Sequence, residues 1–163
     1  MTPSLKDFLK QKATVYAAES EKNRAVIMEW RAAVDRLFTQ LEGWLVNADP
    51  EGIIRPTRDP IEVTEPGLGR YSISRLNLQA FDKWVGLIPK ARKTVKRAAP
   101  QQKGAPEQAT GRVDITDEIR RYVLYRFPEG TEDQWFIDDT AANSELQPLT
   151  AERFEAALLS YFQ

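Results

Sequence analysis

The sequence of 163 residues predicts a single α+β domain: a long N-terminal helix, an antiparallel meander of about five to six strands, and a C-terminal helix on the same sheet face. Three observations support this prediction. Apolar residues recur at helical spacing up to residue 48, short alternating runs follow over 53–138, and helical spacing returns over 150–162. The links between the alternating runs are too short for crossover helices, so consecutive strands should pair antiparallel.

The first predicted element is a helix over residues 1–49. Thr2 or Ser4 can cap its start, and Pro50 stops it. Its apolar residues follow alternating spacings of four and three, interrupted only by two polar residues in the middle. These apolar residues are Leu9, Ala13, Tyr16, Ile27, Trp30, Val34, Leu37, Leu41, Trp44 and Ala48.

The length of this helix exceeds the size of the domain that would support it. A straight helix over 3–48 measures about 69 Å, whereas the remaining chain forms a body roughly 35 Å across. The helix therefore projects, pairs with a copy of itself, or turns back near Ser20–Arg24 into a hairpin. No Gly or Pro marks a turn there, which favours one continuous helix. For its second half, packing on the sheet is favoured over a coiled coil, whereas for residues 5–26 the two alternatives are closer to even.

The predicted strands span 61–64, 70–78, 84–89, 111–116, 121–127 and 134–138, with turn residues between them. The apolar phase slips within 70–78, which predicts a bulge or bend near Arg75. In the final helix Thr150 is the expected cap. The apolar face of that helix comprises Phe154, Ala157, Leu158, Tyr161 and Phe162.

The chain contains no Cys and no His, which removes thiolate nucleophiles, Ser-His-Asp apparatus and His- or Cys-bound zinc. We therefore expect no cofactor, no metal and no catalytic residue, and the composition leans against an enzyme. A carboxylate-based hydrolase or divalent-metal binder around Asp114, Asp117 and Glu118 is a remote alternative, since the spacing lacks the form of an EF-hand loop. With no leader pattern and no run of ~18 apolar residues, the sequence predicts a cytoplasmic protein outside the membrane.

The net charge of −1 conceals an asymmetry along the chain. Residues 90–111 hold six basic residues and one acid, whereas 112–163 hold five basic and eleven acidic residues. We expect 90–110 to be a mobile loop, because its end is rich in Pro, Gln and Ala. Its cations form an alternative site for nucleic acid or another anion: Lys90, Arg92, Lys93, Lys96, Arg97 and Lys103. Nucleic acid is not favoured, because the segment lacks an aromatic for base stacking, and a lysine-protected edge strand is preferred.

Alternation within 121–127 predicts two different strand faces. The apolar set Val123, Tyr125 and Phe127 should face the helices, leaving Tyr122 and Arg126 on an exposed face. Cross-strand packing within the sheet is an equally weighted alternative for this face. The sequence thus favours a non-enzymatic interaction module that binds a protein partner or forms a homodimer, through the long helix and the Tyr/Trp/Arg face. The candidate contact residues are Tyr16, Ile27, Trp30, Tyr122 and Arg126.

Overall fold

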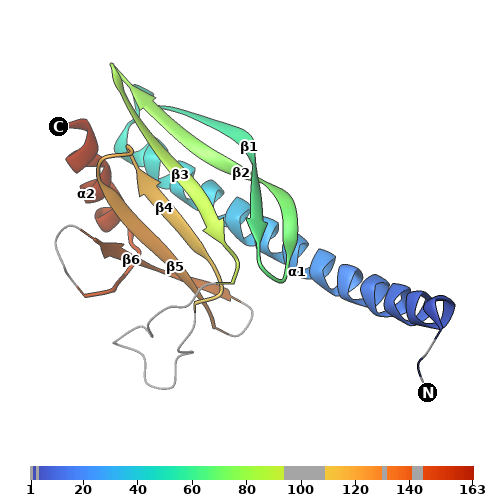
Figure 1. The fold of residues 1–163 in the computed structure, drawn as a ribbon. Coiled ribbons are helices and arrows are strands. Elements are labelled where there is room, and N and C mark those ends of the chain that lie inside the picture. The colour runs from blue at the N-terminus through green and yellow to red at the C-terminus, as the bar shows by residue number, and fades with distance from the viewer. Residues whose placement is uncertain (1, 3, 94–108, 130–131, 141–144) are drawn as a thin grey trace.

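A computed structural model of the chain describes residues 2, 4–93, 109–129, 132–140 and 145–163 (Figure 1). The predicted α+β class is confirmed, and every predicted strand is present. A further strand of two residues, β7, was not predicted. The elements are α1 (Leu5–Ala48), β1 (Arg55–Glu65), β2 (Gly69–Ala80), β3 (Lys83–Ala91), β4 (Arg112–Thr116), β5 (Arg121–Glu129), β6 (Glu132–Asp139), β7 (Gln147–Pro148) and α2 (Ala151–Phe162).

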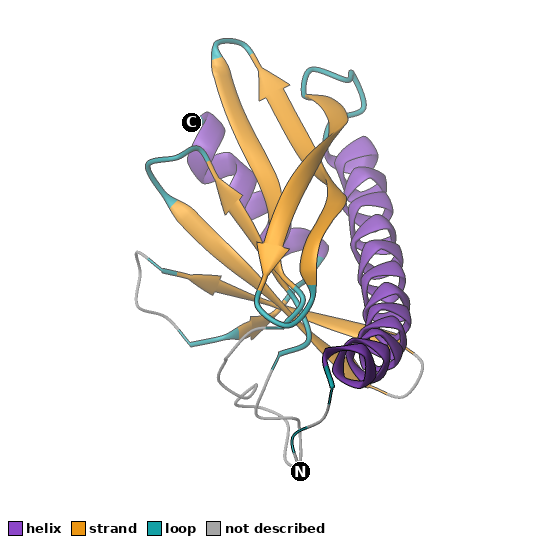
Figure 2. Ribbon diagram, turned by 45° about the vertical axis from the view of Figure 1, so that its right-hand side comes forward, coloured by secondary structure: helices purple, strands orange, loops and turns teal. Residues whose placement is uncertain are grey.

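The seven described strands form one antiparallel sheet in which each strand pairs with the next along the chain. This confirms the predicted meander. Both helices pack on the same face of the sheet, with α1 running behind β1 and β2 and α2 packed at β3 (Figures 1 and 2). The pairing of β3 with β4 shifts register between Pro89 and Ala91, which marks an irregularity at the point where β3 ends.

The β1–β2 hairpin bends without a bulge. The two strands pair residue for residue along the whole of β1, so there is no bulge near Arg75. Of the two predicted alternatives, a bulge or a bend, the structure has the bend. Tyr71 and Ile73 are buried in the first half of β2, whereas Leu76 and Leu78, of opposite parity, are buried in the second half. Because all four side chains join the same core, the hairpin must turn over near Arg75 to keep facing the helices. Figure 1 shows β1 and β2 bending together.

The main core lies between the sheet and the two helices. The second half of α1 supplies one continuous buried face, which confirms that this half packs on the sheet. Trp30 is at its N-terminal edge, with its ring centroid 6.2 Å from that of Trp135. The same indole covers Gly111 so closely that a Cβ on this glycine would lie 2.2 Å from a ring carbon. The buried face comprises Trp30, Ala33, Val34, Leu37, Phe38, Leu41 and Leu45.

A second, smaller core covers the opposite face of β5 and β6 and overturns the predicted orientation of β5. Val123, Tyr125 and Phe127 pack there with Ala109, Phe136 and Leu146. The apolar set therefore faces away from the helices, and the expectation of an open face carrying Tyr122 and Arg126 is wrong. The physical reason is that both faces of β5 are covered, so apolar side chains are buried on either side.

Polar caps fix the ends of both helices, as the sequence indicates. The Ser4 hydroxyl accepts the backbone N–H of Asp7 at 3.1 Å, and the Thr150 hydroxyl accepts that of Arg153 at 3.2 Å. The Tyr161 hydroxyl of α2 donates to the carbonyl of Ile115 at 2.7 Å, which ties this helix to β4. Both helices therefore start at defined residues, and α2 is held on the sheet.

Candidate interaction surface on the first helix

The N-terminal part of α1 projects beyond the rest of the protein. The helix has 44 residues and is therefore about 66 Å long. Its fully buried residues begin only at Trp30, and residues 5–19 are all exposed. Figure 1 shows this part of α1 extending past the sheet as a single helix. The prediction of one continuous helix is thus confirmed, and the hairpin alternative is wrong.

Exposed apolar side chains line one side of the projecting segment. At about 100° per residue, Leu5, Leu9 and Tyr16 share the helix side that later carries Trp30 and Val34. Phe8 and Val15 widen this strip of surface. The apolar face that packs on the sheet therefore continues past the body with nothing among the described residues to cover it. We call the five exposed residues the projecting stripe: Leu5, Phe8, Leu9, Val15 and Tyr16.

The structure separates the candidate contact residues that the sequence suggests. Tyr16 belongs to the projecting stripe and is 69% exposed, whereas Ile27 is half-buried at the edge of the core. Trp30 is 0% exposed, as the favoured core packing of this half implies, so it is not available to a partner as the candidate list proposed. Tyr122 packs edge-on against Tyr161 of α2, with ring centroids 5.7 Å apart. Of the five candidates, Tyr16 is therefore the one that is exposed.

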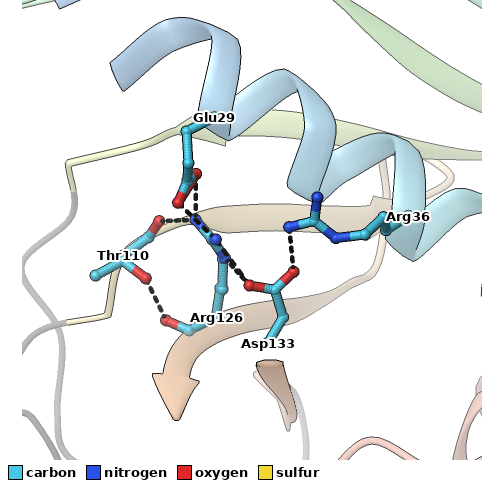
Figure 3. Close-up of polar contacts among 5 residues, drawn as sticks. All are labelled: Glu29, Arg36, Thr110, Arg126 and Asp133. Atoms are coloured by element: carbon cyan, nitrogen blue, oxygen red, sulfur yellow. Dashed lines mark hydrogen bonds and ion pairs between the residues drawn. The ribbon is translucent and has the colours of Figure 1, made fainter. Parts of the chain in front are cut away.

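Arg126 is buried at the root of the projection, contrary to its expected exposure. Its guanidinium donates to both carboxylate oxygens of Glu29, at 2.7 and 3.0 Å, and to Asp133 at 2.8 Å (Figure 3). The other oxygen of Asp133 accepts from Arg36 at 2.9 Å. Glu29 and Arg36 lie two turns apart on α1. These four residues, the Arg126 clamp, therefore fix α1 on β5 and β6 where the helix leaves the body.

Arg126 and Asp133 are held in their charged forms by their partners in the clamp. Burial opposes the charge on Arg126, but hydrogen bonds to Glu29 and Asp133 outweigh it and raise the pKa of the guanidinium. Burial likewise opposes ionisation of Asp133, yet hydrogen bonds from Arg36 and Arg126 lower the pKa of that carboxyl below its usual 3.8. The clamp is therefore an ionic contact across neutral pH.

We expect the contribution of Asp133 to stability to disappear in acid. Because the folded protein lowers the pKa of this carboxyl, ionised Asp133 stabilises the fold above pH 3.8, and the gain is lost as pH falls through the folded-state value. Asp133→Asn should therefore lower the free energy of unfolding at pH 7 and lose most of its effect near pH 2. Urea titrations at several pH values measure this difference. The exposed Glu155→Gln serves as control, and an Asp133→Asn deficit independent of pH would contradict the assignment.

A groove lies at the base of the projection, between α1 and the β1–β2 turn. It has a volume of about 380 Å³, and its apolar walls include Tyr16, Ile27, Leu68 and Tyr71. The hydroxyl of Tyr71 donates to the buried carboxylate of Glu65. Burial, followed by this hydrogen bond, raises the pKa of Tyr71, so the phenol stays protonated as a donor. The groove therefore adjoins the projecting stripe at Tyr16, and its Tyr71 side is held in place by the hydrogen bond to Glu65.

The described part of the basic segment adjoins the same carboxylate. The backbone N–H groups of Arg92 and Lys93 each donate to Glu65 at 3.0 Å, while Lys90 and the side chain of Lys93 are exposed. Most of the expected 90–110 loop lies outside the described residues, as do the predicted edge strand and three of the cations. Anion binding by this segment stays a prediction. The three cations are Lys96, Arg97 and Lys103.

The acidic residues in and just after β4 serve separate structural roles. Asp114 is buried and accepts from the guanidinium of Arg112 at 2.8 Å. Asp117 caps the following turn by accepting the backbone N–H groups of Ile119 and Arg120 at 2.9 and 2.8 Å. Within the described ranges, no group of three or more Asp and Glu side chains is arranged to hold a metal ion. Asp114 therefore has an arginine partner, and Asp117 has backbone partners in the turn.

No helix in the described part of the chain has both the length and the apolar character needed to cross a bilayer. Comparisons of the chain with models of protein families, with curated proteins and with solved structures find no match. No relative therefore indicates a function, and the projecting stripe is the surface from which one is inferred.

Proposed function

We propose that the protein is a non-enzymatic interaction module that binds another protein chain through the projecting stripe. The observation that supports this proposal is the uncovered apolar face of α1 from Leu5 to Tyr16. Covering one large apolar side chain contributes roughly 1.5–3 kcal/mol, so several together can hold a partner. Exposed apolar surface gathered on one side of an element is typical of interaction sites.

The attachment of α1 to the body favours binding by this segment. A helix of about 15 residues is only marginally stable alone in water. Here the segment continues a helix that the main core and the Arg126 clamp hold in place. A partner therefore meets a helix that is already formed, which reduces the entropy cost of association.

The proposed surface is narrower than the one the sequence favours. Tyr122 is half-buried against α2, and Arg126 is buried in the clamp, so neither supplies an open sheet face. Trp30 belongs to the core. The contact surface proposed here is therefore confined to the projecting part of α1 and the groove at its base.

A photo-reactive residue placed in the projecting stripe tests this function. The probe replaces Leu9 in one variant and Thr14 in a matched variant, because Thr14 lies on the far side of the same exposed segment. Irradiation in the cells that make the protein should give discrete cross-linked products from position 9 and not from position 14. Mass spectrometry identifies the chain attached. Absence of products from position 9, or equal yields from both positions, would overturn the proposal.

A further inference from the structure

We infer that the partner of the projecting stripe is a second copy of this chain, with the two α1 helices antiparallel. This inference rests on the proposed function and names the occupant of the same surface. It follows from the charge order along the segment, from the length of helix that is free, and from the groove at its base.

The charges on the projecting segment are divided between its two halves. Residues 5–12 carry a net charge of +2, whereas residues 13–19 carry a net charge of −1, from Glu19, and hold no basic residue. Parallel pairing in register places each charge beside its own copy, whereas antiparallel pairing centred between residues 12 and 13 places Lys6 of each copy beside Glu19 of the other. The charge order therefore favours the antiparallel arrangement. The charged residues of the projecting segment are Lys6, Asp7, Lys10, Lys12 and Glu19.

The length of the free helix sets the register of such a pair. Residues 5–19 measure roughly 22 Å, and beyond them each helix meets its own β1–β2 turn. Two segments that overlap completely are therefore centred near Lys12 and Ala13, which is also where the charge changes sign. Ala13 lies at this centre, and its small side chain permits the close approach of the two helices there.

The groove extends the contact beyond the two helices. In this register Leu5 of one copy lies beside Ser20 of the other, at the mouth of the groove lined by Ile27, Leu68 and Tyr71. Two short helices alone bury less than the roughly 1,200–2,000 Å² of a stable interface. With the groove added the interface remains modest, so we expect a monomer–dimer equilibrium with a Kd of about 1 μM to 1 mM.

Sedimentation velocity across protein concentration tests self-association. The native chain should shift toward the mass of a dimer as its concentration rises to about 1 mM. The double variant Phe8→Gln, Leu9→Gln should stay monomeric, whereas Thr14→Gln, Ala18→Gln, on the far side of the helix, should dimerise like the native chain. All four positions are exposed, so the fold should survive each change. Added salt should weaken the native dimer, because the arrangement pairs opposite charges.

The absence of cysteine permits a clean test of orientation. Antiparallel pairing centred between residues 12 and 13 places position 9 of one copy beside position 16 of the other. Leu9→Cys and Tyr16→Cys, mixed and oxidised, should therefore give mainly the mixed disulfide, while each variant alone gives little dimer. Efficient self-linkage of each single variant would indicate parallel helices and overturn the inference.

The outcomes distinguish this inference from the function on which it rests. A chain that stays monomeric at every concentration, but whose position 9 probe attaches to a different protein, overturns self-pairing and leaves the interaction function standing. A probe that attaches to nothing overturns both. A probe that attaches to a second copy of the chain, together with the mixed disulfide, supports both.

Discussion

Trp30→Ala is expected to lower the free energy of unfolding by about 3–5 kcal/mol, the usual cost of truncating a large buried aromatic. Trp30 is 0% exposed, and its ring packs against Trp135 and over the backbone at Gly111. The alanine variant would leave a cavity between α1, β4 and β6 that a neighbouring glycine cannot fill. Urea denaturation followed by circular dichroism measures the loss.

Tyr16→Ala is the matched control for Trp30→Ala. Both residues are large aromatics on the same side of the same helix, but Tyr16 is 69% exposed. At low protein concentration this variant should change the free energy of unfolding by less than about 0.5 kcal/mol. Similar losses for the two variants would contradict the division of α1 into a core half and a projecting half.

Arg126→Leu is expected to lower the free energy of unfolding by about 3 kcal/mol, at the lower end of the range for breaking a buried ion pair. The arginine side chain is 5% exposed, and its removal leaves Asp133, 14% exposed, with Arg36 as its one ionic partner among the residues that the structure describes. Glu29 is 48% exposed, so water can hydrate its carboxylate once the arginine is gone. We therefore expect a loss in stability at the lower end of the range. Chemical denaturation at neutral pH measures the change.

Two further variants identify the cause of the Arg126 effect. Arg121→Leu removes a guanidinium that is 51% exposed and lies 3.6 Å from Asp114, so it should cost less than about 1 kcal/mol. The double variant Arg126→Leu, Asp133→Leu should have a higher free energy of unfolding than Arg126→Leu alone, because it removes the carboxylate that has lost its arginine partner. A double variant that is less stable than Arg126→Leu would show that packing rather than charge dominates.

The caps and strands could be predicted because their signals are local. Ser4 and Thr150 each lie three residues before the N–H group they accept, so a short window of sequence contains the whole interaction. The strands are bounded by turn residues within the same few positions. β7 could not be predicted, because its two residues are too few to show the apolar–polar alternation of a strand.

The orientation of β5 could not be predicted because it depends on distant partners. Alternation correctly separates Tyr122 and Arg126 from Val123, but it does not say which set faces the helices. The answer depends on Ala109 and Leu146, which build a second core on the other face. It depends also on Glu29, which lies 97 residues from Arg126 in the chain.

The candidate surface was predicted in part. The comparison of helix length with body size indicated an overhang, and Tyr16 was found by the four-and-three spacing. Leu5, Phe8 and Val15 depart from that spacing, so a search confined to one period missed them. Their signal is the wider apolar arc that continues the buried face of the second half of α1.

The closeness of Trp30 to Gly111 constrains how this sequence can diverge. Any side chain at position 111 would occupy the space of the indole, since a Cβ there would lie 2.2 Å from it. A related chain with a residue larger than glycine at 111 must therefore carry a smaller residue at 30. The two positions, 81 residues apart, should change together during evolution, and this covariation would identify true relatives of the fold.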